Sequence, residues 1–210
     1  MCLLYEHGGL WIDATVYVSQ LIPEKVFQEP LFTVAANIDT DNISQAKWMG
    51  FILGSSPQGV LCSFARELFF QYWEKENKLL DYFLIDYVIS IAKTNLASVR
   101  RSLNSIPTDH SQIFDLENMM NKAYKRKLFS KTLCEQQIFH KLSYKNKHAQ
   151  YTNKGVRTLY HMLISNNYFY ALTFSITYFH LLQERSRYKV FYYLFNSILN
   201  LLSKNLYFPS

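Results

Sequence analysis

The sequence predicts a mixed domain of strands and helices, either α/β or α+β, followed by a C-terminal helical hairpin. Three observations support this fold class. Short runs of β-branched and aromatic residues fill the first part of the chain, helical periodicity follows from Gln58, and an aromatic stretch without charged side chains begins after Arg157. Because 49% of the 210 residues are hydrophobic and only 6 are Gly and 5 are Pro, disordered and collagen-like proteins are excluded.

The first elements are a short helix and a strand, separated by the glycine pair Gly8–Gly9. Residues 2–7 are typical of the last turn of a helix, which one of the two glycines closes in a left-handed conformation. Residues 10–12 form a buried strand that ends at Asp13, and the β-type residues 16–18 continue it. A carboxylate is therefore expected directly at the end of a strand.

Changes in hydrophobic periodicity predict the rest of the domain. Apolar residues recur every three or four positions in two helices that are joined near residues 76–78. In the second helix, Leu84, Tyr87 and Ile91 form the apolar face, and Asp86 lies on the opposite face. The expected strands cover residues 32–35, 48–53 and 136–142, the two helices begin at Gln58 and near Leu80, and a shorter helix covers residues 114–124.

Charge is divided unevenly along the chain. Residues 1–120 carry a net charge of −6 and residues 121–210 a net charge of +12. This asymmetry predicts a basic surface in the last third that meets an anionic partner, for which nucleic acid, anionic lipid and nucleotide phosphates are candidates. The sequence carries no RNA- or DNA-binding module, so we expect no nucleic-acid partner.

The three cysteines indicate a reducing compartment. Cys2, Cys62 and Cys134 form no C-x-x-C pair, and their odd number leaves one thiol outside any set of disulfides. The first residues also lack the basic and apolar regions of a secretory signal peptide. We therefore expect a cytoplasmic protein that is peripheral at the inner face of the cell membrane.

A basic, polar stretch over residues 141–157 predicts a domain edge, with one domain over 1–145 and a basic linker and aromatic hairpin over 146–210. Residues 158–183 carry no formal charge, but His and Asn side chains interrupt them, which disfavours a membrane-spanning hairpin. An interfacial hairpin over residues 158–210 that contacts anionic lipid is favoured. The alternative is a helical pair packed on the first domain.

The strongest chemical candidate is Asp13, which follows the glycine pair and a buried strand. A carboxylate at the end of a strand in an open α/β sheet lies at the edge where ligands bind. There it can hold a hard divalent cation, which clamps a diphosphate. The alternative is that Asp13 only caps a turn after the strand.

The stretch Leu4-Tyr5-Glu6-His7-Gly8-Gly9-Leu10-Trp11-Ile12-Asp13-Ala14-Thr15-Val16 resembles the hallmark of the capsular polysaccharide synthesis proteins, which are bacterial relatives of glycosyltransferase family 32. Weaker resemblance continues through residues 48–51, 69–73, 80–87 and 139–144, so that it covers roughly residues 3–145. It implies a GT-A-like fold for a nucleotide-diphospho-sugar transferase. The aromatic hairpin has no counterpart in the resemblance.

By this resemblance, Gly8 and Gly9 shape the loop beneath the sugar nucleotide, and Trp11 supports the core. Asp13 is implied to be the first Asp of the motif that binds metal and nucleotide. Thr15 stands where the wider family has its second Asp. A hydroxyl is a poorer metal ligand than a carboxylate, so dependence on Mn²⁺ or Mg²⁺ stays open even though the implied cofactor is a divalent cation.

Three further residues are site candidates. Asp86 is the candidate for the base that activates the acceptor, and its alternative is a solvent-facing helical Asp. His140 and Ser143, at the end of the last predicted strand, are candidates for contact with the diphosphate. A lone His is more often structural.

The sequence thus predicts transfer of a sugar from a nucleotide-sugar donor to a glycan acceptor in capsular polysaccharide synthesis. Seven residues precede Gly8, whereas the resemblance implies a nucleotide-binding part before the motif, so we expect a fold that lacks this part. The alternative function is that of a truncated or degenerate remnant without turnover, which acts as a binding or membrane-associated protein.

Overall fold

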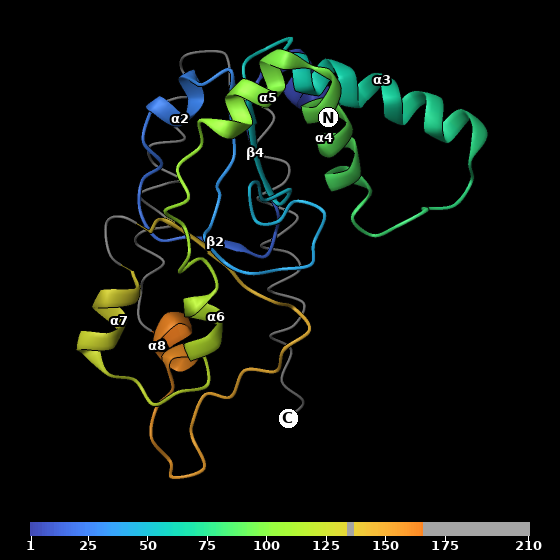
Figure 1. Ribbon diagram of the computed structural model, residues 1–210. Helices are drawn as coiled ribbons and strands as arrows, with labels where there is room; N and C mark the ends of the chain where they lie inside the picture. The colour runs from blue at the N-terminus through green and yellow to red at the C-terminus, as the bar shows by residue number, and fades with distance from the viewer. Residues whose placement is uncertain (134–136, 166–210) are drawn as a thin grey trace. The chain divides into compact units, whose positions relative to one another are not determined.

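Two small antiparallel sheets form the centre of the computed structural model, which describes residues 1–133 and 137–165 (Figure 1). The first sheet has the order β1-β4-β3, with β1 at Gly9–Ile12, β4 at Ile52–Ser55 and β3 at Leu31–Phe32. The second pairs β2 (Val16–Val18) with β5 (Phe139–Lys141). The mixed fold class is confirmed, and the described strands pair antiparallel in two small sheets.

Strand β4 lies between β1 and β3, and a glycine allows the three strands to approach closely. The prediction of a strand over residues 48–53 was wrong in its bounds, because β4 starts at Ile52 and ends at Ser55. Gly54 pairs with Leu10 on one side and with Phe32 on the other. A Cβ at Gly54 would lie 2.9 Å from the Cβ of Phe32, so only glycine fits between these strands.

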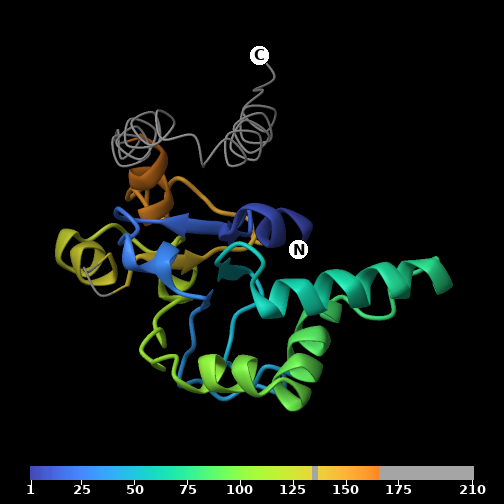
Figure 2. The same cartoon turned by 90° about the horizontal axis from the view of Figure 1, so that it is seen from above.

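Helices α1, α3, α4 and α5 cover the first sheet and share one core. Their bounds are Cys2–His7 for α1, Val60–Lys75 for α3, Leu84–Asn95 for α4 and Ala97–Asn104 for α5. The buried residues of this core include Leu53 of β4, Leu61 of α3, Ile89 of α4 and Leu103 of α5. Seen from above, α3 extends away from the sheets, and the chain then returns through α4 and α5 (Figure 2).

The predicted apolar face of α4 was right for Leu84, which is buried, and wrong for its other two residues. Tyr87 and Ile91 are each 44% exposed, whereas Val88, Ile89 and Ala92 are buried against the neighbouring helices. The apolar residues of α4 that pack into the core are Leu84, Val88, Ile89 and Ala92. Asp86 lies on the buried side, so the alternative of a solvent-facing Asp is also wrong.

Three short helices form a second core below the second sheet (Figure 1). They are α6 (Asp115–Met119), α7 (Arg126–Thr132) and α8 (Leu159–Ser165). Leu116, Met119, Phe129 and Leu159 are the buried residues of this core. The remaining described helix, α2, covers Lys25–Gln28. Neither α2, α5 nor α7 was predicted.

The described part of the chain contains no helix with the length and hydropathy needed to cross a membrane. The predicted aromatic hairpin lies outside the described residues from position 166 onward.

Candidate functional site

Asp13 lies at the end of β1, as predicted. Its backbone N–H donates to the carbonyl of Phe51 at 2.9 Å, which extends the β1–β4 ladder one residue beyond the pair Ile12–Ile52. The first sheet therefore fixes the backbone from which the Asp13 carboxylate projects.

The second sheet brings Lys141 to this carboxylate. Val16 of β2 pairs with Lys141 of β5, and the next N–H of the chain, that of Leu142, donates to the carbonyl of Thr15 at 2.8 Å. As a result, the Lys141 Nζ lies 2.7 Å from Oδ2 of Asp13 and also donates to Oγ1 of Thr15. Two residues that are 128 positions apart in the sequence thus form an ion pair.

Thr15 completes this Asp13–Thr15–Lys141 cluster. Its hydroxyl donates to Oδ2 of Asp13 at 3.2 Å, and its backbone N–H approaches Oδ1 at 3.4 Å. The side chains of Asp13 and Lys141 are 38% and 20% exposed, so a ligand in solution can reach the cluster. The ammonium of Lys141 also lies 4.9 Å from the ring centroid of Phe51.

The cluster keeps Asp13 ionised. Partial burial raises the pKa of the Asp13 carboxyl, but the hydrogen bond and the charge of Lys141, with the bonds from Thr15, outweigh burial and hold that pKa below its ordinary value of 3.8. At neutral pH the pair is an anion held by a cation.

Asp86 occupies a different environment. It is buried in the first turn of α4, and Nε1 of Trp48 donates to its Oδ1 at 2.9 Å. A Cβ on Gly50 would lie 3.0 Å from the same oxygen. Burial raises the pKa of the Asp86 carboxyl, which the bond from Trp48 opposes in part. The structure shows no contact between Asp86 and the Asp13–Thr15–Lys141 cluster, and its role as a base stays a prediction.

His140 points away from the cluster, since adjacent residues of β5 face opposite sides of the sheet. Its side chain has no exposed surface, and Nε2 lies 3.1 Å from the hydroxyl of Ser19. Burial lowers the pKa of His140 from 6.5 to about 4, so the imidazole is neutral at neutral pH. In this structure His140 is a core residue and offers no surface to a diphosphate.

Ser143 lies two residues beyond Lys141, where its backbone N–H donates to Oε2 of Glu117 at 3.0 Å. Glu117, from α6, also accepts from the side chain of Asn146 and pairs with His148 at 3.5 Å. Its carboxylate therefore fixes the loop that follows β5. The Ser143 hydroxyl accepts the N–H of Lys145 at 3.2 Å, and contact of this hydroxyl with a diphosphate stays a prediction.

Gly8 and Gly9 lie at the opposite end of β1 from Asp13, roughly 13 Å away along the strand. Gly8 closes α1 with φ +66°, as predicted, and its N–H donates to the carbonyl of Leu4. A Cβ there would lie 2.8 Å from the carbonyl oxygen of Ser55. The described geometry thus explains Gly8 by packing, and its part in a sugar-nucleotide loop stays a prediction.

Trp11 does not support the core as expected. It is 42% exposed on β1, between the buried Leu10 and the half-buried Ile12. Because residues two apart share a face of a strand, Trp11 is on the same side as Asp13. An aromatic surface therefore accompanies the carboxylate.

The match to a protein-family model decides the family. The family described as capsular polysaccharide synthesis protein matches residues 1–163, which include β1, the Asp13–Thr15–Lys141 cluster and most of α8. The chain belongs to this family. Searches of curated proteins and of solved structures each found no match.

The described residues of this capsular polysaccharide synthesis family member do not fit a divalent cation. They contain no group of three or more His, Cys, Asp or Glu side chains that could hold a metal ion. Asp13 is the one carboxylate of its cluster, and both of its oxygens already accept hydrogen bonds. Its best-placed oxygen, Oδ2, is bonded to an ammonium, which repels a metal ion.

Lys141 and Glu117 are the site residues that the sequence did not predict. Lys141 lies within the block 139–144 that carries weak family resemblance, directly after His140 and two residues before Ser143. Pairing of β2 with β5 was the missing information, because it alone places Lys141 opposite Val16. No signal in the sequence links Glu117 to the loop after β5.

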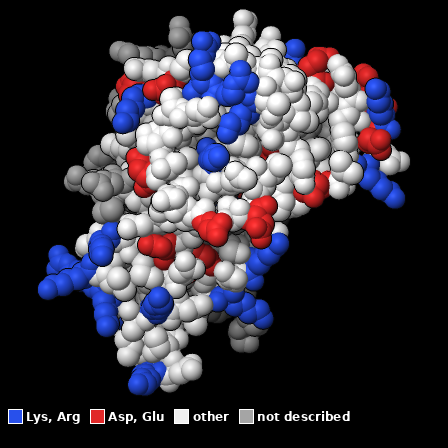
Figure 3. Space-filling model, viewed as in Figure 1, with Lys and Arg blue, Asp and Glu red and all other residues white. Residues whose placement is uncertain are grey.

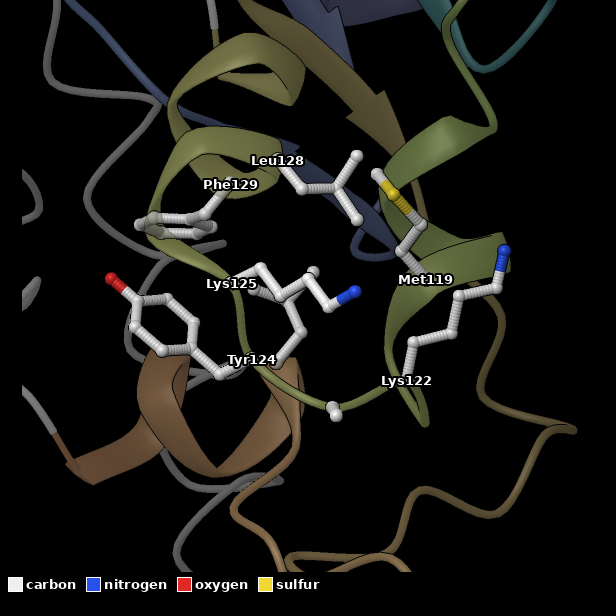
Figure 4. Close-up of a pocket in the computed structure, with 8 residues that line it drawn as sticks. Met119, Lys122, Tyr124, Lys125, Leu128 and Phe129 are labelled. Atoms are coloured by element: carbon white, nitrogen blue, oxygen red, sulfur yellow. The ribbon is translucent and has the colours of Figure 1, made fainter.

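The predicted basic surface is present around α7. Arg126, Lys127 and Lys131 of this helix are exposed, and Figure 3 shows Lys and Arg side chains gathered along that edge. The nearby cavity between α6, α7 and α8 is lined by Lys122 and Lys125 among apolar side chains (Figure 4). Its volume of about 10 Å³ is that of a water site and too small for a nucleotide.

A larger cavity of about 200 Å³ lies near the start of α3, where Ser56, Gly59, Val99 and Ser102 are among the residues that line it. Neither of these two cavities includes Asp13. The partial exposure of Asp13 and Lys141 shows that the cluster at the end of β1 is reachable from solution.

Proposed function

We propose that this chain transfers a sugar from a nucleotide-diphospho-sugar donor to a growing capsular polysaccharide. Membership of the capsular polysaccharide synthesis family supports the pathway. The observation that carries the reaction is the accessible, ionised carboxylate of Asp13, held by Lys141 and Thr15 at the end of β1. A GT-A-like organisation and a relation to glycosyltransferase family 32 belong to the same proposal.

In this function the carboxylate of Asp13 accepts hydrogen bonds from hydroxyl groups of the donor. The first sheet holds its backbone, and the bonds from Thr15 and Lys141 fix its rotamer, so little conformational entropy is lost when a donor binds. Trp11 on the same face supplies an aromatic surface beside it. Asp86 as the base toward the acceptor, and contacts of Ser143 with the diphosphate, are further parts of the proposal.

Removal of the Asp13 charge tests the function. The purified chain is given a panel of radiolabelled nucleotide sugars with capsular glycan as the acceptor, and incorporation is measured. We expect D13N to lower kcat/KM on the order of a hundredfold, the scale for loss of one transition-state contact. D39N removes an exposed carboxylate from a loop and is the matched control. Equal rates for D13N and D39N would contradict the proposal.

The second candidate is a protein that binds the donor without turning it over. The observation in its favour is that the cluster contains a single carboxylate, which Lys141 already neutralises. Calorimetric binding of nucleotide sugar by the wild type without any incorporation would support it. An association of residues 158–210 with anionic lipid stays a prediction, and residues 166–210 lie outside the described structure.

A further inference from the structure

The Asp13–Thr15–Lys141 cluster already contains a cation. The ammonium of Lys141 is 2.7 Å from the carboxylate oxygen that a metal ion would use, and it also bonds to Thr15. These are the two residues that stand in the motif for which a divalent cation was expected. The lysine thus supplies a positive charge to the oxygen for which a divalent cation was expected.

We propose that Lys141 binds the diphosphate of the donor directly and that binding at this site needs no divalent metal. This inference rests on the proposed function, because it names the residue that holds the charged part of the donor.

The backbone of Lys141 is held firmly enough for this role. It pairs with Val16 in the second sheet, and its N–H donates to the carbonyl of Ile113 at 2.8 Å. The two preceding residues of β5, Phe139 and His140, are buried. A lysine so anchored presents its ammonium at a fixed place, which lowers the entropy lost on binding.

The ammonium also has capacity for a ligand. Lysine carries three N–H donors, and among the described residues Asp13 and Thr15 accept two of them. The side chain is 20% exposed, so the third donor can reach a phosphate oxygen from solution. Lysine binds phosphate as a point charge and needs no second donor in a fixed plane.

The same contacts disfavour a metal ion. A divalent cation that binds Oδ2 of Asp13 must displace the ammonium or lie a few ångströms from it, where the two positive charges repel. Displacement loses a charge-assisted hydrogen bond, and Thr15 offers only a hydroxyl in compensation.

The test uses the complete 210-residue chain with inorganic pyrophosphate as the probe. Pyrophosphate binding is measured by calorimetry in EDTA and again with Mn²⁺, and binding of Mn²⁺ alone is followed by electron paramagnetic resonance. K141M removes the proposed donor. K145M removes the charge of a lysine four residues away whose ammonium lies near Tyr82 and Tyr144, and it is the matched control.

We expect pyrophosphate to bind the wild type and K145M in EDTA, and K141M to bind it at least about tenfold more weakly, as for loss of a charge-assisted bond. Without pyrophosphate, the wild type and D13N should bind Mn²⁺ equally, because Asp13 holds no metal ion. Equal affinities of K141M and K145M, binding that requires Mn²⁺, or a Mn²⁺ site that D13N abolishes would each overturn the inference. If K141M fails to fold, the wild-type measurements still decide whether binding needs a divalent metal.

Failure of the proposed function can be distinguished from failure of the Lys141 inference. If only the proposed function fails, pyrophosphate binds through Lys141 without metal, but no nucleotide sugar is turned over. If pyrophosphate requires Mn²⁺ while sugar transfer proceeds, the function stands and the role of Lys141 falls. If the wild type binds pyrophosphate under neither condition, the inference is overturned.

Discussion

His140 makes the stability of the fold depend on pH below neutrality. Its side chain is fully buried, and burial lowers its pKa from 6.5 to about 4. Between these values the unfolded chain binds more protons than the folded chain, so stability falls as the pH drops from 6.5 toward 4 and then levels off. From pH 7.5 to pH 5 this amounts to about 2 kcal/mol.

Urea unfolding at the two pH values measures this effect. We expect H140N to lose the pH-dependent part, whatever its own stability. H7Q, which alters an exposed histidine at the end of α1, should retain the full difference. A wild-type free energy of unfolding that is unchanged between pH 7.5 and pH 5 would show that the imidazole can be protonated in place.

Trp48 is expected to stabilise the fold through Asp86. The W48F substitution removes the indole N–H that donates to the buried carboxylate and leaves Asp86 without that partner. An unsatisfied buried acceptor costs on the order of 2 kcal/mol. Burial already raises the pKa of Asp86, and loss of the donor raises it further. The destabilisation should therefore grow as the pH rises through the raised pKa of Asp86 in the folded wild type, because the wild type can then ionise the carboxyl beside the indole N–H and W48F cannot.

W73F is the control, because Trp73 is half exposed on α3. Thermal unfolding of both variants at pH 4 and pH 7 separates the effects. Loss of packing lowers stability equally at the two pH values, whereas loss of the hydrogen bond to a charged group is larger at pH 7. A pH-independent deficit for W48F would mean that the bond to Asp86 contributes nothing beyond packing.

At the scale of elements, Gly8 forms the sharp turn that connects α1 to β1. It has φ +66°, and a Cβ there would lie 2.7–2.8 Å from Pro57 and from the carbonyl oxygen of Ser55. G8A should therefore destabilise the fold by about 3 kcal/mol or more, since strain and overpacking add. Gly155 has a similar φ of +72° with nothing within 4 Å. G155A should cost only about 1 kcal/mol, and chemical denaturation compares the two.

Local patterns predicted the elements whose cause is local. The glycine pair ended α1, the run after it formed β1, and helical spacing gave α3. The α4–α5 break could not be predicted in this way. It occurs at Leu96, where the backbone is extended and Arg100 bonds to the carbonyl of Thr94 at 2.9 Å. Such a break depends on contacts between neighbouring helices.

For the candidate site, too, the sequence predicted the residues that are close in the chain and missed the distant one. Asp13 and Thr15 are close in sequence, and their pairing follows from a motif. Lys141 reaches them only because β2 pairs with β5, and no periodicity encodes which strands pair. Adjacent residues of a strand face opposite sides, and the sequence alone does not show which side of β5 is buried, so it predicted His140 and not Lys141. The sequence thus predicted the carboxylate but not its cation.

At the scale of the whole molecule, the extent of the folded unit matters most. The prediction of a boundary at residue 145 is not tested by the structure, but packing favours a later one. Leu159 of α8 is buried in the core with Leu116 and Phe129. Backbone N–H groups of Leu159 and Tyr160 donate to the carbonyls of Lys122 and Met120, both at 3.0 Å. The family match also continues to residue 163.

Truncation decides between these boundaries. A chain that ends at residue 165 keeps α8, whereas one that ends at 145 exposes the apolar core between α6 and α7. We expect the longer chain to unfold cooperatively in urea and the shorter one to lose that cooperativity. In the full chain, L159A should cost about 2–5 kcal/mol, as for other buried leucines. I164A, on the exposed side of the same helix, should change stability by less than about 0.5 kcal/mol. If residues 1–145 unfold as cooperatively as residues 1–165, α8 is an appendage and the boundary lies where composition placed it.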